Sequence, residues 1–154
     1  NGAELPVNVV FLLSDAEELA MRGAVTAAFD AEPDEAIAVD VSFGNGIGIK
    51  DEECGKLGGG AMIGFSPTLD SGISAKLVSL AEDCKIKYQT EVMGGRTGTN
   101  ADVISVSRGG VKTCTVSVPL RNMHTEAELL KISDLESVCD LLVKYILSGG
   151  VRNA

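Results

Sequence analysis

The sequence predicts an α/β domain in which a mostly parallel sheet is flanked by helices. Short Val-rich apolar runs alternate with segments of helical periodicity along the 154 residues, which is typical of strands joined by helical crossovers. The runs are apolar almost throughout, as expected for parallel strands that are buried on both faces. With 45% hydrophobic residues, the chain can bury the core of one domain. We therefore expect a single domain over residues 1–154.

The amino-terminal part predicts two buried strands with a helix between them. Residues 7–13 (VNVVFLL) are apolar on both faces, and residues 36–41 (AIAVDV) repeat that pattern. Ser14 and Glu17 have the spacing of a capping box, so we expect a helix to follow the first strand directly and to end before Pro33. Its apolar face consists of Leu19, Met21, Ala24, Ala27, Ala28 and Phe29.

The rest of the chain continues the alternation and ends in an amphipathic helix. Ser133 and Glu136 have capping-box spacing at the head of a helix over 135–147, which Gly149 and Gly150 end. Before it, the pattern predicts a glycine-rich loop over 43–60, a strand over 61–65, a helix over 74–84, a strand over 88–93, a loop over 94–99, a short helix over 101–107 and a strand over 113–118.

Charge and cysteine usage exclude several classes of function. The net charge of −9 argues against a nucleic-acid partner, which requires clustered Lys and Arg. No apolar run reaches the roughly 18 residues of a membrane span, so we expect no membrane partner. The four cysteines form no CxxC pair and are interpreted as free thiols in a reducing cytoplasm; they are Cys54, Cys84, Cys114 and Cys139.

Polar residues follow several of the predicted strands. Glu17 and Glu18 follow the first, Asp40 lies at the end of the second, and His124, the one histidine, follows the last. Ligands of open α/β sheets bind beyond the carboxyl ends of strands, and carboxylates and imidazole are ligands of zinc or cobalt. Each residue also has an ordinary explanation as a helix cap, a turn residue or a surface residue, and no tight motif such as HExxH is present.

Five blocks of the sequence resemble the M42 peptidases, the glutamyl- and tetrahedral-aminopeptidase group, of which some members are labelled endoglucanases. The blocks are EELAMRGA (17–24), IAVDVS (37–42), KLGGGAMIG (56–64), YQTEVMGGRTGTNAD (88–102) and VSVPLRNMHT (116–125). The resemblance implies the zinc-peptidase (phosphorylase/hydrolase-like) catalytic fold. It also implies a hydrolase acting on peptides, and a homo-oligomer.

The resemblance assigns roles to four residues. Glu17 falls on the general acid/base, Glu18 on a metal ligand, Asp40 on a ligand of the other metal, and His124 on a ligand that shares the metal of Glu18. The implied reaction is hydrolysis of the N-terminal peptide bond by water that two divalent metal ions activate, zinc or cobalt. The loop expected to line the substrate cleft contains Gly95, Thr97, Gly98 and Thr99.

The chain also departs from the family pattern. Ala16 and Ala20 stand where the family usually has Gln and Gly. The upstream His-x-Asp block, the bridging aspartate and the inserted β-barrel-like domain would precede Val7. We therefore expect the carboxyl-terminal part of a catalytic domain, with a partial or empty metal site and little activity alone.

Two other functions remain open. One is a non-catalytic oligomerisation or interaction module of a cage-forming peptidase. The other is a glycan hydrolase, which needs paired carboxylates and usually aromatic platforms. The absence of Trp and the 4% aromatic content disfavour the second.

Overall fold

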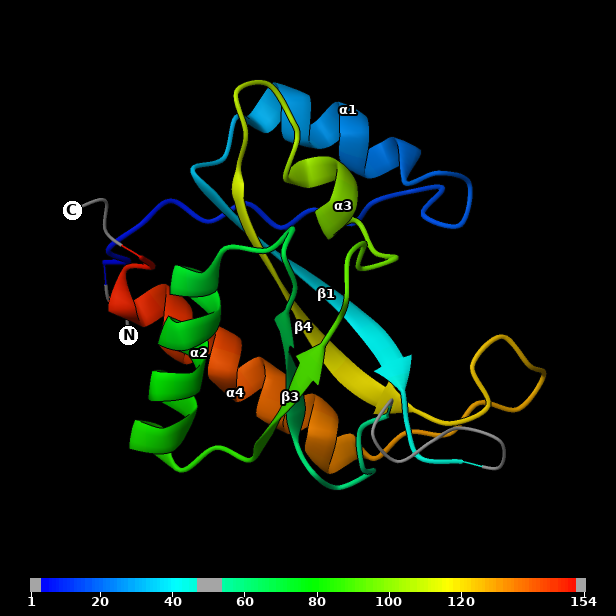
Figure 1. Cartoon of the computed structure of the whole chain (residues 1–154). Coiled ribbons are helices and arrows are strands. Elements are labelled where there is room, and N and C mark those ends of the chain that lie inside the picture. The colour runs from blue at the N-terminus through cyan, green and yellow to red at the C-terminus, as the bar shows by residue number, and fades with distance from the viewer. Residues whose placement is uncertain (1–3, 47–53, 152–154) are drawn as a thin grey trace.

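The computed structural model describes residues 4–46 and 54–151, which form a sheet with helices packed against it (Figure 1). No helix within these ranges is long and apolar enough to span a bilayer. The elements are α1 (Arg22–Ala31), β1 (Glu35–Phe43), β2 (Ala61–Phe65), α2 (Ser71–Cys84), β3 (Tyr88–Val92), α3 (Ala101–Ile104), β4 (Lys112–Leu120) and α4 (Ile132–Ser148).

The sheet is mixed, with the strand order β1-β4-β2-β3. β1 is parallel to β4 and β2 is parallel to β3, but β2 runs antiparallel to β4. The α/β class is confirmed, whereas the expected mostly parallel sheet is corrected to two parallel pairs joined by an antiparallel contact. Parallel strands need a long crossover, usually helical; the described residues between β1 and β2 contain no helix, and these two strands run in opposite directions on either side of β4. The carboxyl-terminal ends of β1 and β4 therefore lie at one end of the sheet, and those of β2 and β3 lie at the opposite end.

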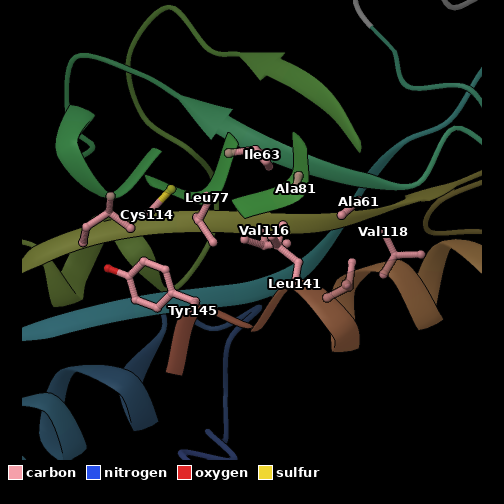
Figure 2. Close-up of a cluster of buried hydrophobic side chains, with 11 residues drawn as sticks. Ala61, Ile63, Leu77, Ala81, Cys114, Val116, Val118, Leu141 and Tyr145 are labelled. Carbon is pink, nitrogen blue, oxygen red and sulfur yellow. The ribbon is translucent and has the colours of Figure 1, made fainter. Parts of the chain in front are cut away.

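The main core lies between the sheet and the helices α2 and α4, which cover one face (Figure 1). β4 is buried along nearly its whole length. Figure 2 shows Val116 and Val118 of β4 beside Leu77 of α2 and Leu141 and Tyr145 of α4. A smaller cluster joins α1 to α3. With one face of the sheet occupied by this core, polar side chains of β1 and β4 are directed to the other face, because side chains alternate along a strand.

The first predicted strand is wrong. Residues 7–13 form no strand, and Phe11 and Leu13 are 84% and 97% exposed. The segment runs beside α4, where Leu5, Val9 and Phe11 line a shallow apolar hollow with Val143 and Leu147. An apolar strand buried on both faces requires covering layers on both sides, and the described residues do not supply them around this segment.

Both capping-box predictions are wrong as well. α1 begins at Arg22 rather than after Ser14, and α4 follows Lys131 with no side-chain cap bond. The hydroxyl of Ser14 instead accepts a hydrogen bond from Asn100 Nδ2 at 2.9 Å. The expected ends hold: α1 stops before Pro33, and Gly149 closes α4 in the left-handed conformation, which glycine adopts without strain.

The other predicted elements are confirmed with small shifts of their ends. β1, β2, α2, β3 and β4 lie where the pattern placed them, and α3 ends at Ile104, three residues earlier than expected. The predicted loop over 43–60 is partly outside the described residues, since 47–53 are not described. None of the four cysteines forms a disulfide within the part of the chain that the structure describes; Cys114 is buried, and Cys84 and Cys139 are exposed.

Candidate functional site

A side-chain contact between Glu18 and His124 joins the turn before α1 to the loop after β4. The Oε1 atom of Glu18 lies 3.2 Å from Nε2 of His124, and both side chains are largely exposed. The loop that carries His124 is closed by two backbone hydrogen bonds between Arg121 and Leu129, of 2.9 and 3.1 Å. Within it, the backbone N–H of His124 donates to Glu128 Oε1 at 2.7 Å, and His124 itself has a φ of 60°. The turn therefore directs the imidazole toward the glutamates.

Glu17 and Glu18 lie in a tight turn between the amino-terminal segment and α1. Ala16, Ala20 and Met21 all have positive φ, at 54°, 68° and 55°. Each L-residue in this conformation costs roughly 1–2 kcal/mol. The turn is held by a hydrogen bond of 2.8 Å from the N–H of Met21 to the carbonyl of Glu17. Such accumulated backbone strain is typical of functional sites.

Glycine at position 23 allows this turn to close against α1. The N–H of Gly23 donates to the carbonyl of Asp15 at 3.0 Å. A Cβ at this glycine would lie 2.5 Å from the same carbonyl oxygen, which is closer than van der Waals contact allows. No larger residue fits here without moving the segment that precedes the two glutamates.

Asp40 occupies the polar face of β1, opposite Ser117 of β4. Its Oδ1 atom accepts the N–H of Val41 at 2.8 Å. Burial raises the pKa of Asp40, the hydrogen bond from Val41 opposes this shift, and the charge of Glu18 adds to it. The pKa of Glu17 is also raised, by desolvation first and then by the charges of Asp40 and Glu18, while His124 lowers it. These interactions place all four predicted residues within one electrostatic neighbourhood.

Glu91 of β3 is a fourth acidic residue of this neighbourhood, and the sequence did not predict it. Its two carboxylate oxygens accept hydrogen bonds from the hydroxyls of Ser42 and Ser117, the latter at 3.1 Å. Burial raises the pKa of Glu91, both hydroxyls lower it, and the charge of Asp40 raises it. The signal available was a carboxylate inside the run YQTEV, which is predicted to be a strand.

The loop after β3 is organised by Asp102. Its carboxylate accepts the N–H and the hydroxyl of Thr97 at 2.8 and 2.9 Å, and the N–H of Gly98 at 3.1 Å. Because β3 runs antiparallel to β1 and β4, this loop leaves the sheet at the end opposite to the carboxyl-terminal ends of β1 and β4. It reaches the glutamate turn through the hydrogen bond between Asn100 and Ser14.

The predicted lining residues of that loop are not brought into contact with the four site residues. Within the described ranges, no hydrogen bond or ion pair joins Gly95, Thr97, Gly98 or Thr99 to Glu17, Glu18, Asp40 or His124. Gly95 instead accepts hydrogen bonds at its carbonyl from the hydroxyls of Ser66 and Thr68. The loop therefore stands beside the charged cluster without touching it.

The donor atoms fit a metal ion in part. Two ligands of a tetrahedral zinc ion with bonds of about 2.0–2.2 Å lie roughly 3.3–3.6 Å apart, and the Glu18–His124 separation of 3.2 Å is slightly shorter than this spacing. In the described residues, however, no group of three or more His, Cys, Asp or Glu side chains is arranged to hold an ion. The pair fits two positions of a coordination shell, and further ligands have to come from elsewhere.

Comparison with known proteins gives one consistent result. The sequence model of the M42 glutamyl aminopeptidase family matches residues 1–141. The chain is 30% identical over 138 residues to a lysyl aminopeptidase of Pyrococcus furiosus, an alignment that covers 90% of this chain and 40% of that protein. The chain thus spans about 40% of the length of the curated relatives that it matches.

Solved structures agree with the sequence match. The TET aminopeptidase of Thaumarchaeota archaeon SCGC AB-539-E09 superposes with a TM-score of 0.82 at 25% identity, covering 90% of this chain and 40% of that one. The TET1 peptidase of Pyrococcus horikoshii, which can assemble into a tetrahedron or a large octahedral shell, superposes with a TM-score of 0.62 at 29% identity. That match covers 84% of this chain and 38% of the other.

Proposed function

This chain belongs to the M42 glutamyl aminopeptidase family, and on that premise we propose that it carries part of a metal-dependent aminopeptidase site that releases N-terminal residues from peptides. The observation that carries the proposal is the Glu18–His124 pair at 3.2 Å, with Glu17 and Asp40 in electrostatic contact beside it. Three carboxylates and an imidazole, which come from the turn before α1, from β1 and from the loop after β4, suit hydrolytic metal chemistry.

We assign the metal ligands by their placement. Glu18 and His124 would hold one divalent ion, since their donor atoms have the spacing of two ligands on one centre. Asp40 would serve a second ion. Zinc and cobalt both accept this mixture of oxygen and nitrogen ligands. When bound, the metal ions would lower the pKa of a water molecule and polarise the peptide carbonyl.

Glu17 is proposed as the group that moves the proton. It precedes the proposed ligand Glu18 in the strained turn, and its carboxylate interacts electrostatically with Asp40, Glu18 and His124. Its raised pKa brings it nearer to the working pH, which is the condition for an effective general base. Glu17 would take a proton from the attacking water and deliver it to the leaving amine.

The loop after β3 is proposed to line the peptide cleft. The loop contains Gly95, Thr97, Gly98 and Thr99, and a Cβ added at Gly95 or Gly98 would meet no atom within 4 Å. The carboxylate of Asp102 fixes the start of the loop. Open space beside an ordered backbone is suitable for extended peptide chains, which pair through main-chain hydrogen bonds.

We further propose that the site is completed by residues outside this sequence. Catalytic zinc usually has three protein ligands, and the described residues bring no three candidates together. The family members that it matches are more than twice as long as the matched region. We infer that the chain is the carboxyl-terminal part of a catalytic domain and that it has little or no peptidase activity alone.

An assembly role is the second candidate, and one observation favours it. Phe11 and Leu13 are almost fully exposed next to an apolar hollow on α4, and exposed apolar patches often mark protein–protein contacts. A related TET1 peptidase forms large shells. In this second role the chain contributes surface for a homo-oligomer and binds no metal of its own.

The test is metal retention at equilibrium together with peptidase assay. We expect the chain to bind zinc or cobalt weakly in equilibrium dialysis, and the His124→Ala variant to bind at least several-fold less, because half of the ligand pair is removed. The exposed Glu136→Gln variant, which also changes one charge, is the control and should bind as the parent does.

Each outcome of this experiment has a definite meaning. Lysyl- and glutamyl-anilide substrates should be hydrolysed no faster than in a reaction without the protein. Strong metal-dependent hydrolysis would contradict the inference that the chain is inactive alone. Equal binding by the parent and by His124→Ala would contradict the assignment of His124 as a ligand. Particles of high mass with no retained metal would support the assembly role.

A further inference from the structure

The segment that leads into the glutamate turn is attached to the rest of the molecule by few polar contacts. Residues 4–14 form no strand or helix, and their apolar side chains rest against α4. Among the described residues, the hydrogen bond of 2.9 Å from Asn100 Nδ2 to the hydroxyl of Ser14 is the only one that ties this segment to another part of the chain. Ser14 is therefore the last fixed point before Glu17 and Glu18.

The hydrogen bonds inside the turn determine its shape but not its place on the molecule. The N–H of Met21 donates to the carbonyl of Glu17, and the N–H of Gly23 donates to the carbonyl of Asp15. Both bonds join residues that are close neighbours along the chain. The contact of the turn with His124 is exposed on both sides, and exposed contacts between charged side chains contribute little to stability. The position of the turn has to be set by contacts with more distant parts of the chain.

The short helix α3 supplies these contacts at both ends of the turn. Asn100 directly precedes α3 and bonds to Ser14, on the amino-terminal side of the turn. Ile104, at the other end of α3, packs against Ala24 and Ala28 of α1, which follows the turn (Figure 1). Apolar packing is non-directional, whereas a hydrogen bond requires a defined distance and angle. The bond from Asn100 is therefore the contact that fixes where the turn starts.

The same helix also holds the loop that is proposed to line the peptide cleft. The carboxylate of Asp102, in α3, accepts hydrogen bonds from Thr97 and Gly98 of that loop. The loop and the glutamate turn are thus attached to one support of four residues. Their relative position depends on the link between Asn100 and the segment before the turn.

Stability alone does not account for an asparagine at this position. The Oδ1 atom of Asn100 is buried and has no hydrogen-bond partner in the part of the chain that the structure describes. A buried acceptor without a partner is unfavourable, and departures of this kind from local consistency are expected at functional sites. Neither the amide of Asn100 nor the hydroxyl of Ser14 carries a charge, so their bond does not depend on the protonation of the carboxylates nearby.

We propose that Asn100 is a positioning residue for the glutamate turn, and that it acts through its hydrogen bond to Ser14. The bond sets where Glu17 and Glu18 stand relative to His124 and to the loop after β3. The importance of this role for catalysis rests on the proposed function of the two glutamates. The positioning itself requires no bound ion, because both partners and the turn belong to this chain.

The test measures the position and the opening of the turn by nuclear magnetic resonance of the whole metal-free chain. In the parent we expect a nuclear Overhauser effect between the ring protons of His124 and the side chain of Glu18, whose polar atoms lie 3.2 Å apart. We also expect slow hydrogen exchange at the amides of Met21 and Gly23, which are bonded within the turn. Exchange at such amides reports local opening.

Four variants separate the hydrogen bond from its surroundings. Asn100→Ala and Ser14→Ala should each weaken the Overhauser effect and speed exchange in the turn by roughly two- to tenfold, the range for loss of one hydrogen bond. Their combination should do no more than either alone, since both remove the same bond. Ser14→Thr keeps the hydroxyl and should behave as the parent does. The control Thr26→Ala removes a hydroxyl that bonds only within its own part of α1 and should leave both measurements unchanged.

The possible results separate this inference from the proposed function. An Asn100→Ala variant with the Overhauser effect and exchange rates of the parent would refute the role of Asn100. Equal behaviour of Ser14→Thr and Ser14→Ala would show that packing, and not the hydrogen bond, places the turn. Faster exchange throughout β4 as well as in the turn would show a general effect on stability and would also refute the inference. Failure to bind metal or to cleave peptides would overturn the proposed function and leave these measurements as they are.

Discussion

At the scale of single residues, the candidate site depends on backbone conformations that its side chains do not favour. Ala16, Ala20 and Met21 surround the glutamate pair with positive φ, and His124 has the same conformation on the opposite loop. The resemblance places a glycine where this chain has Ala20, and the φ of 68° gives that preference a physical reason. The turn is consequently under more strain here than a glycine would impose.

Replacing Ala20 with glycine should therefore stabilise the chain. Relief of the left-handed strain contributes roughly 1–2 kcal/mol, and the added freedom of glycine in the unfolded chain removes about 0.5–1 kcal/mol. We expect a net gain of about 0.5–1 kcal/mol in the free energy of unfolding, measured by urea denaturation with an unchanged m-value. Ala27→Gly, within α1, is the matched control and should lose about 1 kcal/mol. A loss at both positions would contradict the proposed strain.

At the scale of elements, the first turn of α4 positions the loop that leads into β2. The buried carboxylate of Asp134 accepts the N–H of Gly58 at 2.7 Å and the N–H of Gly60 at 2.9 Å. Gly60 requires its freedom, because a Cβ there would lie 2.0 Å from the carbonyl oxygen of Lys87. The sequence predicts a capping box of Ser133 and Glu136, but the amino-terminal end of α4 has no side-chain cap. Asp134 in the same turn bonds instead to the loop before β2.

Asp134→Ala should destabilise the chain strongly. It leaves two backbone N–H groups without partners, and each hydrogen bond to a charged acceptor contributes about 1.5–3 kcal/mol. We expect a loss of about 3 kcal/mol in the free energy of unfolding by urea titration. Asp140→Ala, at an exposed position of the same helix, should change it by less than about 0.5 kcal/mol. Similar losses for both variants would contradict the role of this carboxylate.

The elements show which kinds of pattern a single sequence can establish. Strand-like patterns of apolar and β-branched residues predicted β1, β2 and β4. The run at 7–13 has the same composition but lies exposed, since burial also depends on neighbouring layers. The antiparallel contact of β2 with β4 was not predictable, because strand direction is set by connections that no local pattern encodes.

The site was predictable to a similar extent. Glu17, Glu18, Asp40 and His124 were predicted through blocks of sequence; in the structure Glu18 contacts His124, and the charges of the four residues influence one another. Their roles stay a prediction. Glu91 was missed because its significance lies in hydrogen bonds to Ser42 and Ser117, the first of them 49 positions away. Pairings across such distances depend on the sheet register and leave no trace in local spacing.

At the scale of the whole molecule, the exposed segment over residues 5–13 is the most unusual surface. Leu5, Val10, Phe11 and Leu13 are all exposed, and the segment has no backbone pairing with a strand. β1 is likewise an edge strand, with Val39 and Phe43 exposed. Unpaired edges and exposed apolar residues favour association.

We expect this surface to cause self-association. Sedimentation velocity should show the average mass of the parent chain rising with concentration, and the double variant Phe11→Ser/Leu13→Ser should remain close to the monomer mass. Its melting temperature should change little, because side chains this exposed contribute little to folding. Val143→Ser, on α4 beside the same hollow, is a second variant. Concentration-independent mass of the parent would contradict this expectation.

The contact between Glu18 and His124 also bears on the order in which parts of the chain fold. β1, which carries Asp40, pairs only with β4 among the described strands, and Ser14 meets Asn100 across 86 positions. Closing such long loops is slow, because chain entropy is lost before the contacts form. The helix α2 and its neighbours β2 and β3 are close in sequence and can assemble early. The charged cluster therefore forms late during folding, when the first and last parts of the chain finally meet.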